Sequence, residues 1–585
     1  MNFNSNESPA VAVSENPARI EVIMVLFKKA LKLIVLILFF LLFCGNANLV
    51  KAFSQSDLNE NGISDSDESD VVVDSNITLP AGEYNFNNLT ITNNAILTLL
   101  GDPGSQDTFK GVKITAVNLT VTADASISAD AKGYGPDGGP GASALSYVGA
   151  SYGGLSYSGL TTSTYGSATK PMDLGSGGAS YGGGAIRIVV SNTFANDGII
   201  SANGNSSSSG GSVYVTANNM AGSGTFSANG GNLYASGYFK SPGGGGRVAL
   251  YYNTLLFNGI IEAKRGCGSY DGFSATCAQN GTVGAFDESS NNLYVNNSWQ
   301  FRASDSPFVL NNIFISNSAK VTSENGVNIT ANNITIDDTS TFTLSGNEII
   351  IASNLLVTGN STITVLPEQV LALNVPSITV EAGSSISANG KGYVTGPGSP
   401  DIFYESAASY GGVGGGLNPK PTYGSATAPI DFGSGAEGNR GGGAIRLIVD
   451  NLQNDGVISA NYPDNGTFRT SGGSIYVTTK NLSGMGSFQA IGGNTSWPYG
   501  FVGAGAGGRI AIYYQNSTFT GNTNVLGGVY CFYGCNPAGG AGTVVMQPLA
   551  PVCAIDCFSN VLFLPGLMGS RLYEEGLDCG PNIVG

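Results

Sequence analysis

Two long stretches of the chain have similar sequences, and this internal duplication limits the possible folds more than any other feature. Ser-Ile-Ser-Ala at residues 126–129 returns at residues 385–388, a shift of 259 (385 − 126). Gly-Arg at residues 246–247 returns at residues 508–509, a shift of 262 (508 − 246). Duplication on this scale indicates an array of stacked units.

A shorter repeat lies between the two copies. Asn-Ile-Phe-Ile at residue 312, Asn-Ile-Thr-Ile at 333, Asn-Leu-Leu-Val at 354 and Ser-Ile-Thr-Val at 377 follow one another in steps of 21, 21 and 23 residues (333 − 312, 354 − 333, 377 − 354). Apolar and polar residues alternate within most of these units, which is typical of a strand with one buried face. Asn, Gly, Ser and Asp fill the spaces between units and favour turns.

A unit this short cannot bury its own apolar face, so we expect the units to stack around one continuous core. We predict an all-β fold, a duplicated right-handed parallel β-helix (β-solenoid). Long Gly-rich insertions at about residues 133–184 and 392–443 are expected to be surface loops on one side. The alternative is a β-sandwich array, whose strands would alternate with hairpin turns every 8–12 residues or so.

Composition narrows the possible chemistry. The 585 residues include 86 Gly and no His, so a Ser-His-Asp triad or a His-ligated zinc site cannot be assembled from them. The net charge of −16 argues against nucleic acid as a partner. Only 11% of residues are charged, but 42% are hydrophobic, which argues against plain disorder.

The N-terminal region predicts export. Lys28, Lys29 and Lys32 precede an apolar run at residues 33–43, and Val50 and Ala52 are small residues suited to cleavage before Phe53. An uncleaved membrane anchor is the alternative, but the apolar run is short for a membrane span. We therefore expect an extracellular or cell-surface protein that meets the membrane only through its signal segment.

Residues 57–68 match the twelve-residue calcium loop D-x-[DN]-x-[DN]-G-x₅-E. This loop resembles those of thrombospondin type 3 repeats and bacterial cell-surface calcium repeats. It implies a calcium ion that stiffens the N-terminal linker, and the alternative is a solvated acidic linker. The expected ligands, mostly side-chain oxygens with one backbone carbonyl, are Asp57, Asn59, Asn61, Ile63, Asp65 and Glu68.

The C-terminal stretch, residues 560–573, reads Asn-Val-Leu-Phe-Leu-Pro-Gly-Leu-Met-Gly-Ser-Arg-Leu-Tyr. It resembles the first strand and oxyanion turn of α/β-hydrolases of the lecithin–cholesterol acyltransferase-like lipase family. The resemblance implies a hydrolase whose nucleophile, acid and histidine would follow Gly585. The alternative is a last apolar strand that caps the solenoid.

These features predict six segments: a signal peptide at 1–52, a calcium-loop linker at 53–70, a first β-helix copy at 71–290, connecting rungs at 291–375, a second copy at 376–550, and the start of a truncated hydrolase-like domain at 551–585. Cysteines come as neighbours, and pairing within each couple is the simplest expectation: Cys267 with Cys277, Cys531 with Cys535, and Cys553 with Cys557.

Three functions compete. The first is a structural or adhesive surface module, because the Gly-rich repeats resemble bacterial surface proteins and adhesins; its partner would be an extracellular polysaccharide or surface ligand. The second is the non-catalytic region of a lipase- or acyltransferase-like hydrolase. The third is a β-helical polysaccharide lyase built on residues that recur in both copies (Arg187 and Arg446, Asp173 and Asp431). Loop tyrosines that could stack on sugars, or simply pack the loops, are Tyr147, Tyr152, Tyr157, Tyr165 and Tyr423.

Overall fold

A computed structural model describes most of the region between residues 70 and 549. The described residues are 51–52, 70–105, 109–143, 148–156, 163–232, 241–268, 276–401, 406–463, 469–495, 503–531, 535–536 and 539–549. The calcium loop, the apolar signal segment and the hydrolase-like stretch lie outside these residues, so they remain predictions. The structure pairs Lys51–Ala52 (β1) with Ile77–Leu79 (β3), a strand that a chain cleaved before Phe53 would lack.

The fold is all-β, with parallel strands in long sheets, as expected for a β-solenoid. In most coils a long strand in a main sheet is followed by a short strand in one of two flanking sheets. The main sheet contains β2 (Asp70–Val73), β4 (Gly82–Ile91), β6 (Val112–Val121), β8 (Ala185–Asn196), β10 (Ser212–Gly222), β12 (Arg247–Phe257), β16 (Thr282–Asp287), β17 (Asn292–Val295), β19 (Phe308–Val309), β20 (Asn312–Ile315), β22 (Asn328–Ile336), β24 (Ile349–Val357), β26 (Val370–Asn374), β27 (Ser377–Val380), β29 (Ala444–Asn454), β31 (Ser474–Ser483), β33 (Arg509–Ser517) and β37 (Thr543–Pro548).

Two flanking sheets complete the coils. The first holds β1, β3, β5 (Ile96–Leu99), β7 (Ser126–Ser128), β9 (Ile199–Ser201), β11 (Thr225–Ser227) and β13 (Ile260–Glu262). The second holds β18 (Ser298–Phe301), β21 (Lys320–Ser323), β23 (Thr341–Leu344), β25 (Thr362–Val365), β28 (Ser385–Ser387), β30 (Val457–Ser459), β32 (Ser487–Gln489) and β34 (Asn522–Asn524). The remaining elements are a 3-10 turn (Ala303–Asp305) and the small pairs β14 (Cys267–Gly268) with β15 (Thr276–Cys277) and β35 (Tyr530–Cys531) with β36 (Cys535–Asn536).

Stacked asparagines mark the register of the main sheet. The side-chain amide of Asn312 donates to Asn292, that of Asn333 to Asn312, and that of Asn354 to Asn333, at 2.8, 2.6 and 2.9 Å. The same residues face one another in the backbone register of β17, β20, β22 and β24. Each amide thus satisfies its neighbour, and slipping the register by one residue would break this ladder and turn the apolar side chains outward.

Where the first copy ends, the apolar core moves from one face of the main sheet to the other. β16 and β17 form an antiparallel hairpin, so strands after Asn292 run opposite to those before it. Val248 and Leu250 of β12 belong to the core of the first copy, whereas Ala249, on the opposite face of β12, belongs to the core that continues through the rest of the chain. The chain therefore reverses and begins its second flanking sheet on the other face of the main sheet.

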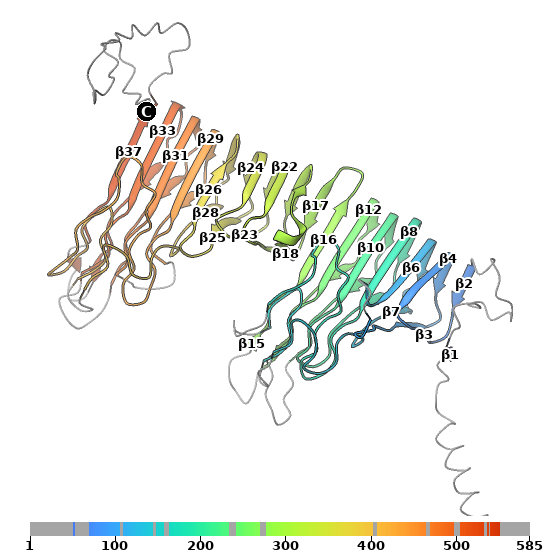
Figure 1. Cartoon of the computed structure of the whole chain (residues 1–585). Coiled ribbons are helices and arrows are strands. Elements are labelled where there is room, and N and C mark those ends of the chain that lie inside the picture. Colours follow the sequence, from blue (N-terminus) through green and yellow to red (C-terminus); the bar gives the residue numbers. More distant parts are fainter. Residues whose placement is uncertain are drawn as a thin grey trace, which may run out of the picture.

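The hairpin corrects the expectation that all successive coils stack in parallel. It does not support the β-sandwich array, because the described strands pair antiparallel at only three places and all other pairings are parallel. Figure 1 shows an elongated molecule in which two groups of glycine-rich segments extend beyond the sheets, separated by the connecting coils. Within the described residues, no helix has the length and hydrophobicity that crossing a membrane requires.

Candidate functional site

The glycine-rich segments are packed bodies that project from the solenoid. We call them the first lobe (described residues among 130–184, 202–211 and 228–246) and the second lobe (389–443, 460–473 and 490–508). Their extended segments lie mostly outside the strands, yet their backbones hydrogen-bond to one another. In the first lobe, Gly133 N donates to Gly182 O at 2.7 Å and Gly183 N to Ser209 O at 3.0 Å. The lobes therefore have an internal hydrogen-bond network made of backbone.

Glycine is required in this network because the segments lie too close for a side chain. A Cβ atom on Gly211 would lie 1.9 Å from Gly184 O, and one on Gly473 would lie 1.9 Å from Gly443 O. Real Cβ atoms do not approach backbone oxygens so closely. The segments lie outside the sheets, as surface loops would, and they also pack closely against one another through their backbones.

Serine hydroxyl groups accept hydrogen bonds from backbone N–H groups in the glycine-rich segments. Ser176 is fully buried, and its Oγ accepts from Gly141 N at 2.9 Å. Ser176 N in turn donates to Ser209 Oγ at 2.8 Å. Because a buried N–H without an acceptor is costly, these small hydroxyl groups replace the ladder bonds of a regular sheet.

Two tyrosines and one arginine join the first lobe to the main sheet. Tyr152 is fully buried, and its hydroxyl group donates to Ser212 Oγ at 2.7 Å, since Ser212 Oγ itself donates to Asp173 O. The rings of Tyr152 and Tyr165 pack with centroids 4.6 Å apart. Arg247 on β12 is also fully buried and donates through Nε and Nη2 to Tyr165 O at 3.2 and 2.8 Å.

The second lobe repeats this cluster. Arg509 donates through Nε and Nη2 to Tyr423 O at 3.1 and 2.8 Å, and the hydroxyl group of Tyr410 lies 2.6 Å from Ser474 Oγ. The rings of Tyr410 and Tyr423 are 4.7 Å apart. Two copies that differ in surface residues have thus kept one buried cluster, which indicates that the cluster anchors each lobe to the sheet.

Burial shifts the pKa values of these groups in the directions that favour their neutral forms. Desolvation raises the pKa of Tyr410 to about 12 and raises those of Tyr152 and Tyr165 further. Desolvation also raises the pKa of the Asp173 carboxyl, against the opposing effect of Arg247, and lowers the pKa of Arg247. These shifts follow from burial inside a structural cluster and need no catalytic role.

The residues proposed for sugar stacking or lyase chemistry serve packing in this structure. Tyr152 is fully buried. The hydroxyl groups of Tyr165 and Tyr423 donate hydrogen bonds to the backbone carbonyl oxygens of Leu174 and Phe432, respectively. Arg187 lies over the ring of Tyr214, 3.6 Å from its centroid, and donates to Thr216 Oγ1. Tyr147 and Tyr157 lie outside the described residues.

Arg446, the counterpart of Arg187, is exposed, and no hydrogen bond or ion pair of its side chain is observed in the described part of the chain. Asp173 and Asp431 each lie beside a glycine with a left-handed backbone, Gly166 and Gly424, where a Cβ atom would meet the carboxylate. Both aspartates thus lie at the same place beside this turn in the two lobes. Such paired positions fit a duplicated scaffold better than an acid–base site.

The expected calcium ligands Asp57, Asn59, Asn61, Ile63, Asp65 and Glu68 all lie outside the described residues. Within the described ranges there is no group of three or more acidic or cysteine side chains arranged to hold a metal ion. The calcium site therefore remains a prediction from the sequence.

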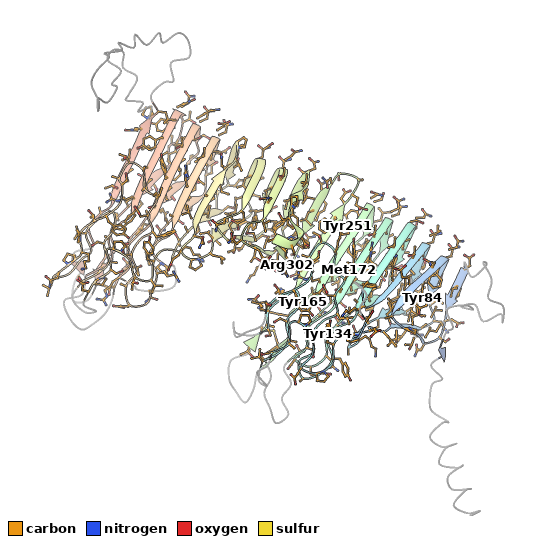
Figure 2. All side chains as sticks on the ribbon, viewed as in Figure 1. Tyr84, Tyr134, Tyr165, Met172, Tyr251 and Arg302 are labelled. Carbon is orange, nitrogen blue, oxygen red and sulfur yellow. A yellow bond between two sulfur atoms is a disulfide. The ribbon has the colours of Figure 1, made fainter. Side chains whose placement is uncertain are left out.

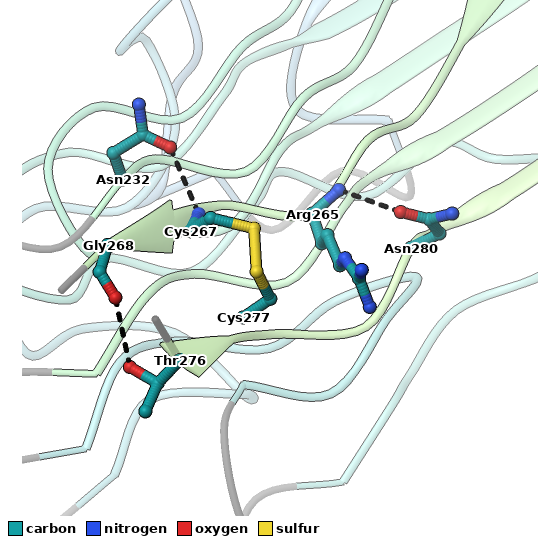
Figure 3. The surroundings of a disulfide bond; sticks show 7 residues. All are labelled: Asn232, Arg265, Cys267, Gly268, Thr276, Cys277 and Asn280. Atoms are coloured by element: carbon teal, nitrogen blue, oxygen red, sulfur yellow. Dashed lines mark hydrogen bonds between the residues drawn. A yellow bond between two sulfur atoms is a disulfide. The ribbon is translucent and has the colours of Figure 1, made fainter. Parts of the chain in front are cut away.

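One of the expected cysteine pairs is formed in the described structure. Cys267 and Cys277 are joined by a disulfide that closes a ten-residue separation between β14 and β15. Figure 3 shows Cys267 N donating to Asn232 Oδ1, which ties this hairpin to the preceding coil of the first lobe. Cys531 and Cys535 face each other in the backbone register of β35 and β36.

Comparison with known proteins gives no relative: no family model, no curated protein and no solved structure matches this chain. Functional reasoning therefore rests on the sequence motifs and on the geometry described above. That geometry is a parallel-strand scaffold with two anchored glycine lobes.

Proposed function

We propose that this chain is an exported β-solenoid, wound as a right-handed parallel β-helix, that acts as a structural or adhesive module outside the cell or at its surface. The observation that carries the proposal is the repeated anchoring of a glycine lobe by Arg247 and by Arg509. A protein that holds two matching lobes at fixed places on a long scaffold is suited to display and contact. The acidic composition and the predicted export signal agree with this role.

A binding experiment tests the adhesive role. Purified chain beginning at Phe53 would be passed over immobilised neutral and acidic polysaccharides and over whole cells, with and without calcium. We expect retention on at least one surface, with no new reducing ends and no unsaturated products in the eluate. Release of such products would instead support a polysaccharide lyase, and failure to bind any polysaccharide or cell would contradict the adhesive role.

Calcium binding at residues 57–68 is part of the proposal. Asp57 and Glu68 would provide the charged oxygens at the first and last positions of the loop, with affinity on the order of 10⁻⁴–10⁻³ M, as in extracellular modules. Titration calorimetry of the chain and of an Asp57→Asn, Glu68→Gln variant tests this. Equal heats for the two proteins would contradict the assignment.

The second candidate is a non-catalytic region of an extracellular lipase- or acyltransferase-like hydrolase. Its support is the stretch at residues 560–573, in which an apolar run leads into Pro565-Gly566. Reading the gene beyond the codon for Gly585 decides it. An in-frame G-x-S-x-G followed by an acid and a histidine would support the hydrolase, and a stop codon would contradict it.

A further inference from the structure

In each copy the main sheet has an outer face, which is turned away from that copy's own core, and in the first copy the chain itself covers this face. The ring of Phe286 stacks on that of Tyr251, with centroids 4.4 Å apart and ring planes 6° from parallel. The ring of Trp299 meets Phe286 edge-on at 5.7 Å, and Trp299 is only 2% exposed. Figure 2 labels Tyr251, Met172 and Arg302 in the region where the first lobe meets the connecting coils. An aromatic ring of the next strand thus fills the stacking place on Tyr251.

The same place in the second copy has no stacked ring. Tyr513 is the counterpart of Tyr251, because the hydroxyl group of each donates to a threonine carbonyl oxygen of its lobe at 2.8 Å. Gln547 stands in register with Tyr513 on the next strand, where the first copy has Phe286. Gln547 is exposed, and among the described residues no aromatic ring stacks in parallel on Tyr513. The outer face of the second copy therefore lacks the cover that the first copy has.

Tyr513 belongs to a patch of outer-face residues on four neighbouring strands, β29, β31, β33 and β37. The strand register aligns the members in two adjacent rows, Ile448, Thr478, Tyr513 and Gln547 in one and Arg446 with Tyr476 in the other. We call these six residues the outer patch. Adjacent strands lie about 4.8 Å apart, so the longer row extends about 14 Å along the solenoid, which suits a short stretch of an extended polymer.

The outer patch is accessible to a ligand. Arg446 and Ile448 are exposed, and both tyrosines are partly exposed. The rings of Tyr476 and Tyr513 meet edge-on with centroids 6.0 Å apart, so they form one aromatic surface. In the first copy Tyr214 takes the place of Tyr476, in register with the preceding arginine, and is only 9% exposed. The duplicated sheet thus has two versions of this surface, one covered and one accessible.

The charges around the outer patch favour an anionic ligand. Asp450 is the only acidic residue in β26, β29, β31, β33 and β37, and it is ion-paired with Lys480 at 2.9 Å. No partner of the Arg446 side chain is observed in the described part of the chain, whereas its counterpart Arg187 donates to Thr216 Oγ1. The whole chain has a net charge of −16, but salt screens charges beyond about 8 Å, so this local cation decides what binds beside it.

We propose that the outer patch binds an acidic polysaccharide, a polymer of uronic acids, and so supplies the contact surface of the adhesive role, on which this inference rests. The apolar face of a sugar ring would stack on Tyr513, in the place that an aromatic ring fills in the first copy. A uronate carboxylate would accept two parallel hydrogen bonds from the guanidinium of Arg446. Thr478 and Gln547 would exchange hydrogen bonds with the sugar hydroxyl groups.

Two forms of one ligand test the proposal. Short alginate oligosaccharides carry a carboxylate on every sugar, and their methyl esters have the same rings without the charge. Binding of the full chain to each immobilised form would be measured by surface plasmon resonance at physiological ionic strength, without calcium, so that calcium cannot bridge two carboxylates. We expect the acid form to bind at least about tenfold more tightly than the ester, because charge-assisted hydrogen bonds are stronger than neutral ones.

Variants of the full chain locate the site. Arg446→Gln should remove most of the preference for the acid form, and Arg446→Lys should keep part of it, since lysine has the charge without the planar fork. Tyr513→Ala should weaken binding of both forms about threefold to tenfold through the lost stacking. Lys320→Gln, which removes one exposed cation from β21 in the second flanking sheet, is the charge-matched control and should leave binding unchanged. Circular dichroism of each variant checks that the fold is kept.

The outcomes separate this site from the adhesive role as a whole. A preference for the acid form that Arg446→Gln retains, or that Lys320→Gln loses equally, would overturn the site and leave the adhesive role in place. Equal binding of the two forms by the unaltered chain, or binding of neither, would overturn the site in the same way. Dimerisation that Tyr513→Ala abolishes would assign the patch to a second copy of the chain and would overturn it too. The adhesive role fails separately, if the chain binds no polysaccharide and no cell.

Discussion

The guanidinium of Arg247 is fully buried, and two of its nitrogens donate to the carbonyl oxygen of Tyr165, 82 positions away in the first lobe. A third nitrogen donates to Thr282 Oγ1 at 3.1 Å. Among the described residues, no other cationic side chain donates a hydrogen bond to Tyr165 O or Thr282 Oγ1. The side chain thus connects the lobe to two adjacent strands of the main sheet.

Replacing Arg247 with Met should therefore loosen the first lobe. The change leaves Tyr165 O without these donors in a buried place, at a cost of about 1–3 kcal/mol. We expect faster proteolysis and hydrogen exchange at residues 164–176, with little change in the second lobe. Lys113→Met, which alters a partly exposed side chain paired with Glu83, is the matched control. Equal effects of the two substitutions would show that Arg247 is not an anchor.

Alanine at a packed glycine should destabilise a lobe through overpacking. In Gly211→Ala, the new methyl group would meet Gly184 O at 1.9 Å, and neither backbone can move without breaking its own hydrogen bonds. Overpacking of this kind typically costs about 1–3 kcal/mol. Gly104→Ala is the control, because its nearest contact is 3.4 Å away. Chemical unfolding followed by circular dichroism should show a lower midpoint for Gly211→Ala alone.

The strand register could be predicted from the sequence because it depends on side chains that recur at fixed steps. The step of 21 residues predicts that Asn312, Asn333 and Asn354 are equivalent, and the structure pairs them directly. Their alternating neighbours specify which face is buried. The Cys267–Cys277 pairing was also correct, because two close cysteines have few alternative partners.

The lobe packing could not be predicted in the same way. Glycine has no side chain, so a run of glycines has no periodic pattern from which to predict its neighbours. The change of core side left a signal that was missed: Val248, Ala249, Leu250 and Tyr251 are apolar on both faces of one strand. Such a strand is covered on both sides. The calcium loop and export signal remain predictions.

Removing the Cys267–Cys277 disulfide should have a local effect. It closes a loop of ten residues, for which chain entropy predicts a contribution of at most about 3 kcal/mol. We expect a Cys267→Ser, Cys277→Ser variant to keep its far-ultraviolet circular dichroism and to be cleaved by protease between these positions. Loss of the whole β signal in the variant would show that the disulfide supports the solenoid rather than one hairpin.

Alkaline pH should unfold the lobes through their buried tyrosines. Burial raises the pKa of Tyr410 to about 12, above the value of about 10 expected in the unfolded chain. The folded state therefore prefers the neutral phenol. The stability gained from this preference is fully present below about pH 10 and is lost as the pH rises from about 10 to about 12.

Tyr410→Phe isolates this contribution. The variant loses the hydrogen bond to Ser474, so we expect it to be about 1 kcal/mol less stable at neutral pH. Between about pH 10 and 12 its stability should fall less steeply than that of the unaltered chain, because it has one fewer group to ionise on unfolding. Tyr181→Phe, at a position 52% exposed, is the control and should leave the slope unchanged. Unfolding followed by tyrosinate absorbance and circular dichroism measures both slopes, and parallel slopes for Tyr410→Phe and the unaltered chain would contradict the assignment.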